Sequence, residues 1–308
     1  MVTRAYNTIT INNQGVATKT SENERLLDEI RYYQNLPWEL KPYFPRFYGC
    51  QTARPPYSYD IEYYGYPNLG QCEIDYPCLF KSLAETLVLF QGRTIHAFDL
   101  LDVYRREMYI DKTINEYNKL IESNEFFKVI SEKSEIHING FIYKNFKVIW
   151  EDIKQLIQTK LFTNAPFTII HGDFCFSNIL SSSVKVTDKT FYRFIDPRGR
   201  FGVQGNYGDP IYDYAKLRHS YANRYEDIIT DNFDVRSGED LIVFAFKTDH
   251  PANLDKIFTD TFKVDINLIK LVEGLIWIGM IARHYDSLDR QKVMYATGIK
   301  TLNEVLCG

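Results

Sequence analysis

The sequence contains no run of apolar residues long enough to cross a membrane. A spanning helix needs about 20 consecutive apolar residues, and no run in this chain of 308 residues approaches that length. The first residues, MVTRAYNTIT, also lack the long apolar segment of a secretory signal. We therefore expect neither a membrane span nor export.

Cysteine is scarce, and its spacing suggests no pairs. The five cysteines stand at positions 50, 72, 78, 175 and 307, without a CxxC motif. No histidine lies near Cys72 and Cys78 to complete a zinc site. An odd number of cysteines at such spacing is typical of free thiols. Because thiols stay reduced in the cytosol, a cytoplasmic location is expected.

An excess of positive charge is also missing. The chain has 36 Lys and Arg against 40 Asp and Glu, a net charge of −4. A general nucleic-acid-binding function is therefore not expected, since phosphate backbones require a basic surface. A local basic pocket for one nucleotide remains compatible with this charge. Aromatic residues, in contrast, are abundant, with 23 Tyr and 21 Phe, and they suit either a core or an aromatic-lined ligand pocket.

The patterns in the first part of the chain predict strands around one helix. Residues 4–20 alternate on both sides of NNQG, which predicts a hairpin. Ser21, with Glu24 three residues later, has the pattern of a capping box, and the helix that follows should end at Pro37. Two further strands are predicted at 46–51 and 57–64.

The remainder of the chain is predicted to be helical. The turn-rich sequence GYPNLG, residues 65–70, marks the boundary between the two parts. A small hairpin is predicted at 135–146. The helices are expected near 77–93, 97–124, 146–160, 208–222, 265–287 and 289–305.

Two apolar runs end in carboxylate and amide side chains. HGDFCFSNIL, residues 171–180, follows one run, and FIDPRG, residues 194–199, ends another. Two strand ends that present such groups indicate a shared site. Asn178 and Asp196 are predicted to bind Mg²⁺, which prefers oxygen ligands and also keeps waters and substrate phosphates. Asp173 can accept the proton of an attacking hydroxyl, and together these roles are what phosphoryl transfer requires.

Lys19 and Glu29 are predicted to form an ion pair. Lys19 lies on a strand with Thr18 and Thr20 facing the other way. Glu29 falls on the buried side of the following amphipathic helix. Because an unpaired buried carboxylate is costly, Glu29 needs a cation, and Lys19 is the nearest one in the sequence. A lysine held in this way is placed to bind nucleotide phosphates.

HGDFCFSNIL followed by IDPRG resembles the aminoglycoside phosphotransferase and choline kinase group of small-molecule kinases. The resemblance implies an α+β, protein-kinase-like bilobal fold. Residues 1–66 would form a small strand-rich N-lobe that binds ATP or GTP. Residues 67–308 would form a larger helical C-lobe with the catalytic loop and the acceptor site. Mg²⁺ would be the metal cofactor.

The resemblance also assigns roles to individual residues. Asp173 matches the catalytic aspartate, Asn178 and Asp196 match the two metal ligands, and His171 matches the histidine that supports the loop. The other matches are the nucleotide lysine and its helix partner at Lys19 and Glu29, a backbone hinge for adenine at Glu62, Tyr63 and Tyr64, and an acid that braces the catalytic loop at Asp213.

The sequence departs from this group before Lys19. A kinase-type lobe usually places a glycine-rich loop over the phosphates, and only NNQG, with Gly15, stands there. Either this turn is a reduced phosphate cover or the lobe lacks one strand.

The acceptor is expected to be a sugar or a similar small polar metabolite. Arg198 and Arg200 follow the metal aspartate and can contact a phosphate or another anionic group, and Tyr207 and Asp213 are further candidates for the acceptor pocket. The IDPRG form resembles bacterial kinases of capsule and surface-polysaccharide pathways. Two alternatives stay open: a choline or ethanolamine kinase, and a catalytically silent nucleotide-binding scaffold.

Overall fold

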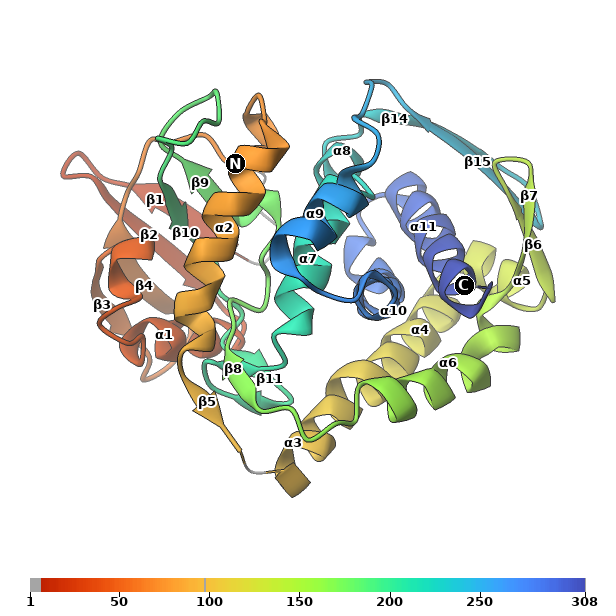
Figure 1. Ribbon diagram of the computed structural model, residues 1–308, viewed down its shortest axis with the longest axis horizontal. Coiled ribbons are helices and arrows are strands. Elements are labelled where there is room, and N and C mark those ends of the chain that lie inside the picture. Colours follow the sequence, from red (N-terminus) through yellow and green to blue (C-terminus); the bar gives the residue numbers. More distant parts are fainter. Residues whose placement is uncertain (1–6, 97, 308) are drawn as a thin grey trace. The chain divides into compact units, whose positions relative to one another are not determined.

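The computed structural model describes residues 7–96 and 98–307, which form two compact units (Figure 1). The first unit consists of Met1–Ile95 and Phe167–Asp213, and the second of His96–Pro166 and Tyr214–Gly308. All residues predicted to bind nucleotide, metal or acceptor therefore belong to the first unit. The predicted lobe boundary near residues 65–70 stays a prediction.

The first unit combines a four-stranded sheet with two helices and several short strands. Its elements are β1 (Asn7–Ile11), β2 (Val16–Ser21), α1 (Leu26–Gln34), β3 (Phe47–Gln51), β4 (Tyr57–Glu62), α2 (Tyr76–Gln91), β5 (Thr94–Ile95), β8 (Phe167–Ile169), β9 (Ile179–Ser181), β10 (Tyr192–Phe194), β11 (Arg200–Phe201), β12 (Val203–Gln204) and β13 (Tyr207–Gly208).

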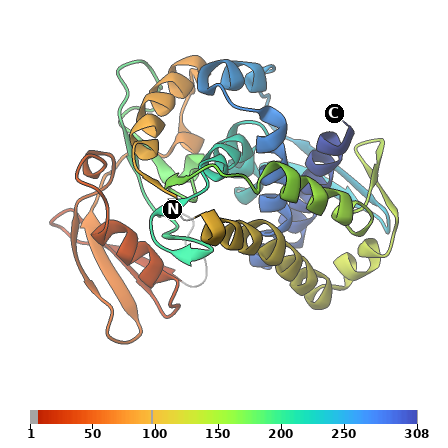
Figure 2. The same cartoon turned by 60° about the horizontal axis from the view of Figure 1, so that its bottom comes forward.

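The sheet has the order β1-β2-β4-β3, and all its neighbouring strands are antiparallel. Tyr57, Tyr59 and Ile61 of β4 are buried and lie on one face. Lys19 pairs directly with Tyr59, so its side chain is on that same face, because directly opposed residues share a face of the sheet. Helix α1 packs against this sheet through β3 and β4 (Figure 2). The predicted hairpin and the strands that follow it are confirmed within the described residues.

The predicted start of α1 is wrong. Ser21 is the last residue of β2, and the helix begins at Leu26. The Oγ atom of Ser21 accepts a hydrogen bond from the backbone N–H of Asn23, whose side chain in turn accepts one from the N–H of Arg25. These local turns satisfy the backbone donors that a capping box would otherwise have taken.

A cluster of buried aromatic rings packs against the predicted catalytic loop. Phe44, Phe90, Phe174 and Phe194 are fully buried and pack with ring centroids 5.0–6.1 Å apart. The ring of His171 stacks on Phe44 at 6.0 Å and also meets Phe174 and Phe194. This core fixes the loop that follows β8.

The second unit is mainly helical. Its elements are α3 (Phe98–Arg105), a π-helical turn (Arg106–Asp111), α4 (Lys112–Ser123), α5 (Glu125–Ser131), β6 (Glu135–Ile138), β7 (Phe141–Lys144), α6 (Phe146–Lys160), α8 (Tyr225–Ile229), β14 (Phe233–Ser237), β15 (Leu241–Phe246), α9 (Leu254–Phe262), α10 (Ile266–Ile278) and α11 (Leu288–Cys307). Helix α7 (Ile211–Tyr221) begins at the end of the first unit and continues into the second.

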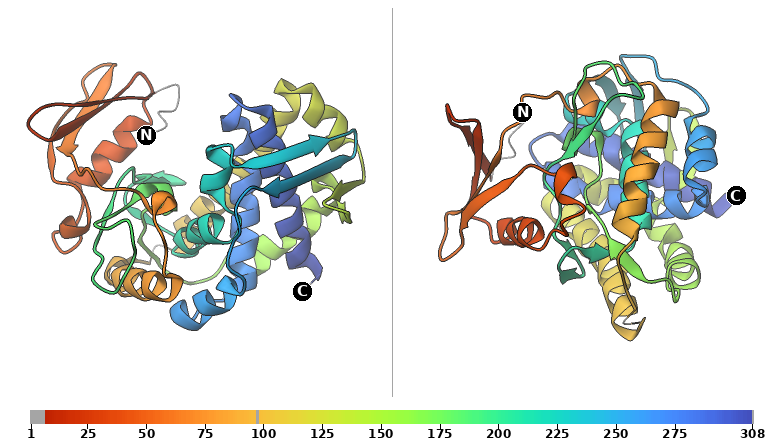
Figure 3. Two further views of the ribbon diagram at one scale, coloured as in Figure 1. Left: turned by 90° about the horizontal axis from the view of Figure 1, so that it is seen from above. Right: turned by 60° about the vertical axis from the view of Figure 1, so that its left-hand side comes forward.

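The second unit is centred on the packing of α10 against α11. Sheet β14-β15-β6-β7 lies along α11, and Figure 3 shows the long β14–β15 hairpin beside that helix. The predicted hairpin at 135–146 is confirmed as β6 and β7, whereas β14, β15 and α9 were not predicted. The predicted helix 265–287 is too long, because α10 ends at Ile278 with Gly279 as its C-cap. In the described part of the chain, no helix combines the length and apolar character that a membrane crossing needs.

Candidate active site

The predicted ion pair of Lys19 and Glu29 is present in the structure. The Nζ atom of Lys19 lies 2.7 Å from Oε2 of Glu29, and the same carboxylate oxygen accepts a hydrogen bond from the Tyr59 hydroxyl at 3.0 Å. Lys19 also lies 3.1 Å from Oδ1 of Asp196. The lysine therefore connects α1 with the strand end that was predicted to hold the metal.

The charges around Lys19 keep it protonated. Burial by itself lowers the pKa of Lys19, but the carboxylates of Asp196 and Glu29 outweigh burial and raise that pKa above its usual value. Burial raises the pKa of Glu29, and its contact with Lys19 opposes that rise only in part. Lys19 is thus a fixed cation beside Asp196, the predicted metal ligand, and such a cation suits binding to phosphate oxygens.

His171 supports the predicted catalytic loop and is uncharged at neutral pH. Burial among the aromatic rings lowers the pKa of His171 to about 4. Its Nδ1 accepts a hydrogen bond from the N–H of Asp173 at 3.2 Å, and its Nε2 lies 3.0 Å from the carbonyl oxygen of Ile195. This pattern requires the neutral tautomer with the proton on Nε2, since a carbonyl can only accept.

Asp213 braces the same loop from the start of α7. One of its carboxylate oxygens accepts a hydrogen bond from the N–H of His171, and the other accepts one from the N–H of Gly172, each at 2.7 Å. Gly172 has φ of +76°, and a Cβ atom there would lie 2.7 Å from Cβ of Arg198. The loop therefore needs glycine at this position for both its backbone conformation and its packing.

Asn178 orients the side chain of Asp173. Its Nδ2 donates hydrogen bonds to the backbone oxygen of Asp173 at 2.9 Å and to Oδ2 of Asp173 at 3.0 Å. Because the amide nitrogen is engaged in these bonds, the amide oxygen is the side-chain atom left to act as a metal ligand. The geometry is compatible with Asp173 as base and Asn178 as ligand, and both roles stay predictions.

Asn178 and Asp196 lie at adjacent strand ends. Strands β9 and β10 are antiparallel partners, and the N–H of Ile195 donates to the carbonyl oxygen of Asn178 at 3.0 Å. Asp196 has φ of +56°, an unusual conformation for a residue with a side chain. In the described residues, no three His, Cys, Asp or Glu side chains gather as a metal site. One carboxylate and one amide oxygen still fit Mg²⁺, because that ion keeps waters and substrate phosphates as its other ligands.

The predicted hinge is tied to the β1–β2 turn. The N–H of Tyr63 donates to the carbonyl oxygen of Gly15 at 2.8 Å, and the Tyr64 hydroxyl donates to Oε2 of Glu62 at 2.7 Å. In the sheet as described, β1 pairs only with β2. The Gly15 turn thus lies beside the predicted hinge, and both interpretations of it, a reduced phosphate cover and a lobe with one strand fewer, stay predictions.

The two arginines after Asp196 have different environments. Arg198 donates from Nη1 to the Tyr212 hydroxyl at 3.2 Å, and its guanidinium lies 5.7 Å from the centre of that ring. Arg200 instead donates from Nε to Oδ2 of Asp28 on α1 at 3.0 Å. Tyr207 is half-buried in β13, where it pairs with Ile169 of β8. Contacts of these three residues with an acceptor stay predictions.

The sequence patterns did not identify Asp28 as part of this region. Asp28 is buried, directly before Glu29, and accepts hydrogen bonds from Arg200 and Gln204. A helical pattern marks two adjacent positions at the edge of the buried face about equally, so only the packing of α1 could separate their roles.

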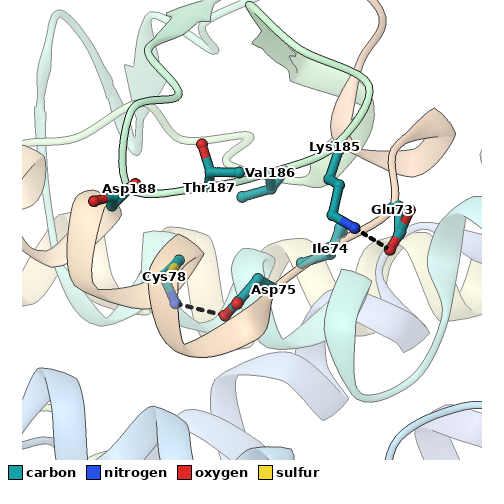
Figure 4. Close-up of a pocket in the computed structure, with 8 residues that line it drawn as sticks. All are labelled: Glu73, Ile74, Asp75, Cys78, Lys185, Val186, Thr187 and Asp188. Carbon is teal, nitrogen blue, oxygen red and sulfur yellow. Dashed lines mark hydrogen bonds and ion pairs between the residues drawn. The ribbon is translucent and has the colours of Figure 1, made fainter.

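Two cavities of the first unit lie apart from these residues. One, of about 490 Å³, is lined by Glu73, Ile74, Asp75, Cys78 and Lys185–Asp188 (Figure 4). There Lys185 pairs with Glu73 at 3.2 Å, and Asp75 caps α2 through the N–H of Cys78. The other, of about 560 Å³, lies between α2, Pro42–Tyr43 and β10. No residue predicted for the active site lines either cavity.

The fold is shared with small-molecule phosphotransferases of known structure. APH(2")-IIia in complex with GDP and kanamycin superposes with a TM-score of 0.55 at 12% identity, over 100% of this chain and 92% of that chain. Plasmodium vivax ethanolamine kinase superposes with a TM-score of 0.54 at 13% identity, over 96% of this chain and 81% of that chain. Spectinomycin phosphotransferase APH(9)-Ia, in complex with ADP and spectinomycin, superposes with a TM-score of 0.50 at 10% identity, over 99% of this chain and 90% of that chain.

These similarities confirm the predicted fold class, an α+β fold with a strand-rich N-terminal part and a helical C-terminal part. They come from the group of aminoglycoside phosphotransferases and ethanolamine or choline kinases that the catalytic loop resembles. No protein-family model and no curated protein sequence matches the chain.

Proposed function

We propose that this protein is a small-molecule kinase that transfers the γ-phosphoryl group of ATP or GTP to a hydroxyl group of a sugar or sugar-like metabolite. The observation that carries this proposal is the position of Lys19 between Glu29 and Asp196, at 2.7 and 3.1 Å. A buried lysine so held next to a metal-type aspartate supports phosphate binding, since its charge is fixed before the nucleotide arrives.

The residues of the catalytic loop would act on the acceptor. Asp173 accepts the proton of the attacking hydroxyl, and Asn178 holds the Asp173 carboxylate in position for that step. His171 and Asp213 hold the loop backbone and take no part in proton transfer. Mg²⁺, bound by Asn178 and Asp196, would supply charge neutralisation for the phosphates.

The nucleotide would bind along the same unit. Lys19 contacts its phosphates, and the backbone at Glu62, Tyr63 and Tyr64 contacts its base. Structures of the same fold contain GDP in one case and ADP in another. Both ATP and GTP should therefore be tested as phosphoryl donors.

A hydroxylated acceptor is favoured by the charge near the catalytic loop. Arg198 contacts the loop through its backbone, with its N–H donating to the carbonyl oxygen of His171 at 2.8 Å. A guanidinium group close to this loop attracts anionic or hydroxyl-rich molecules and repels a quaternary amine. Two of the similar structures contain kanamycin and spectinomycin, and the resemblance to surface-polysaccharide kinases points to sugars as well.

Ethanolamine or choline is the second candidate acceptor, because an ethanolamine kinase shares the fold. A silent scaffold is disfavoured, since Lys19, Asp173, Asn178 and Asp196 are all retained. We place the activity in the cytoplasm, because all five cysteines are free thiols, and we expect no nucleic-acid partner.

The test is a turnover assay with MgATP and MgGTP against a panel of acceptors. The panel contains neutral sugars, amino sugars, sugar phosphates, ethanolamine and choline, and phosphorus nuclear magnetic resonance identifies any product. Transfer to a sugar hydroxyl supports the proposal. Preferred transfer to choline or ethanolamine would show that the acceptor is an amino alcohol and not a sugar. Nucleotide binding without turnover of any acceptor would favour the catalytically silent scaffold.

A further inference from the structure

The segment of residues 199–206, which begins three residues after Asp196, contacts α1 at Gly199, Gln204 and Asn206. This segment contains β11 and β12, which pair as a tight hairpin through Phe201 and Val203. The N–H of Gly205 donates to the carbonyl oxygen of Gly199 at 2.9 Å and closes the hairpin at its base. We refer to residues 199–206 as the helix-docking hairpin.

The backbone of the hairpin touches the backbone of α1 at Gly199. A Cβ atom at Gly199 would lie 2.0 Å from the carbonyl oxygen of Asp28 and 3.2 Å from the backbone nitrogen of Glu29. Gly199 also has φ of +64°. No side chain fits between these two backbones, so the glycine sets how closely α1 approaches the hairpin.

Side chains of the hairpin add polar contacts to α1. Nε of Arg200 donates to Oδ2 of Asp28 at 3.0 Å, and Nε2 of Gln204 donates to Oδ1 of the same residue. The side-chain oxygen of Gln204 in turn accepts from Arg31. One turn further along, Nδ2 of Asn206 donates to the carbonyl oxygen of Tyr32 at 3.2 Å.

These contacts act on a helix that also carries Glu29. Asp28 is 7% exposed, and both of its carboxylate oxygens are bound by the hairpin. The next residue, Glu29, binds Lys19, and Lys19 binds Asp196, which stands three residues before the hairpin. The chain thus forms a closed set of contacts, from Asp196 through the hairpin to α1 and back through Lys19 to Asp196.

We propose that Asp28 and Arg200 are positioning residues that hold α1 where Glu29 meets Lys19, and so prepare the nucleotide site. This inference rests on the proposed function. Without the pair, α1 keeps its apolar contacts with the sheet but is free to shift relative to the hairpin. Lys19 then loses its fixed position, because one of its two carboxylate partners moves.

This role gives Arg200 a different function from the acceptor contact that the sequence suggested. An arginine that binds the acceptor should affect the KM of the acceptor and should not depend on Asp28. An arginine that positions α1 should affect nucleotide binding, and its loss should have the same effect as the loss of Asp28.

The test compares Asp28→Asn, Arg200→Gln and the double variant with the wild type. Asp260→Asn serves as a matched control, because Asp260 forms an exposed ion pair with Lys256 at 2.9 Å in the second unit. Equilibrium binding of a fluorescent ATP or GTP analogue with Mg²⁺ gives nucleotide affinity, and initial rates give kcat and both KM values. Thermal unfolding of each variant reports whether the fold is retained.

We expect each single variant to weaken nucleotide affinity by about 10–100-fold, as is usual when a partner that orients a binding group is lost. The KM of the acceptor should change by less than about twofold. The double variant should bind nucleotide about as tightly as the single variant with the lower affinity, because the effects of changing two residues that contact each other are not additive. Arg200→Lys should restore part of the affinity, since an ammonium can still reach Asp28.

Two results would overturn the inference alone. One is wild-type nucleotide affinity in both single variants that still fold. The other is a raised acceptor KM in Arg200→Gln with no effect of Asp28→Asn. If Asp28→Asn does not fold, Arg200→Gln and Arg200→Lys still test the inference. The side chain of Arg200 is 45% exposed, so we expect these variants to fold. A wild-type protein that binds no nucleotide would instead contradict the proposed function.

Discussion

Nζ of Lys19 lies 3.1 Å from Oδ1 of Asp196, so the lysine of β2 and the aspartate after β10 form a direct ion pair. The same nitrogen binds Glu29 on α1 at 2.7 Å. A single buried cation therefore balances two carboxylates that come from distant parts of the chain. Lys19 therefore links the sheet, α1 and the end of β10 through these two ion pairs.

Replacing Lys19 with methionine should destabilise the fold as well as abolish nucleotide binding. The change leaves the partly buried Glu29 carboxylate, 18% exposed, without its cation. Breaking a fully buried pair from one side costs about 3–5 kcal/mol, which is the upper end of the expected loss. Denaturant unfolding measures this loss. The double variant Lys19→Met with Glu29→Gln should recover part of the stability, because the uncompensated charge is removed. The exposed residue Lys256 provides the control variant Lys256→Met. Equal stability of Lys19→Met and the wild type would show that the pair contributes nothing to folding.

Changes at Asn178 and Asp196 should alter the dependence on Mg²⁺ in different ways. Asp196→Ala removes a carboxylate ligand and should weaken nucleotide binding at every Mg²⁺ concentration. Asn178→Asp keeps an oxygen ligand but loses the Nδ2 donor that holds Asp173. It should therefore bind Mg²⁺–nucleotide and yet turn over slowly. Titration of Mg²⁺ against nucleotide binding distinguishes the two effects. An unchanged Mg²⁺ dependence in Asp196→Ala would remove this aspartate from the metal site.

His171 should make folding stability depend on pH and leave the rate profile unaffected near neutrality. Its pKa falls from an ordinary 6.5 to about 4 on folding, because the ring is buried. The imidazole therefore binds a proton more readily in the unfolded chain than in the folded protein. As a result, the free energy of unfolding should be highest above about pH 6.5 and should decrease as the pH falls towards about 4. The loss should approach about 1.4 kcal/mol per pH unit.

Unfolding measurements between pH 7 and pH 4 check this expectation. The stability of the wild type should fall more steeply than that of His171→Asn, which has no imidazole to titrate. His137→Asn, at an exposed position, should follow the wild type. Parallel curves for the wild type and His171→Asn would contradict the assignment of a neutral buried ring.

The parts of the fold that the sequence predicted are those with strong local patterns. The alternation around Asn12 to Gly15 predicted the first hairpin, and α6 has the predicted bounds, 146–160. The Lys19–Glu29 pair was also predictable, because a buried acid needs a cation. The hairpin and α6 depend mainly on neighbouring residues, whereas the ion pair joins β2 to α1 and was predictable from the cost of leaving a buried charge unpaired.

The parts that it missed depend on packing between distant segments. The apolar run around α10 continues past Gly279, so its pattern could not show that the helix ends at Ile278. The helix-docking hairpin has no periodic pattern, and its two strands contain two residues each. The partnership of Arg200 with Asp28 could be recognised only once the hairpin was seen against α1.

A phosphoryl-transfer assay that compares Asp173→Asn with the wild type is the sharpest test of the proposed kinase activity. Wild type and variant are incubated with Mg²⁺, a γ-labelled nucleotide and the best sugar acceptor, and the labelled product is quantified. We expect the wild type to form sugar phosphate. The variant should bind nucleotide with nearly wild-type affinity but show kcat lowered by about 10²–10⁴-fold, because a positioned base is lost. Equal turnover by Asp173→Asn would rule out Asp173 as the base. A wild-type protein that binds nucleotide but phosphorylates no hydroxyl acceptor would contradict the proposed kinase activity.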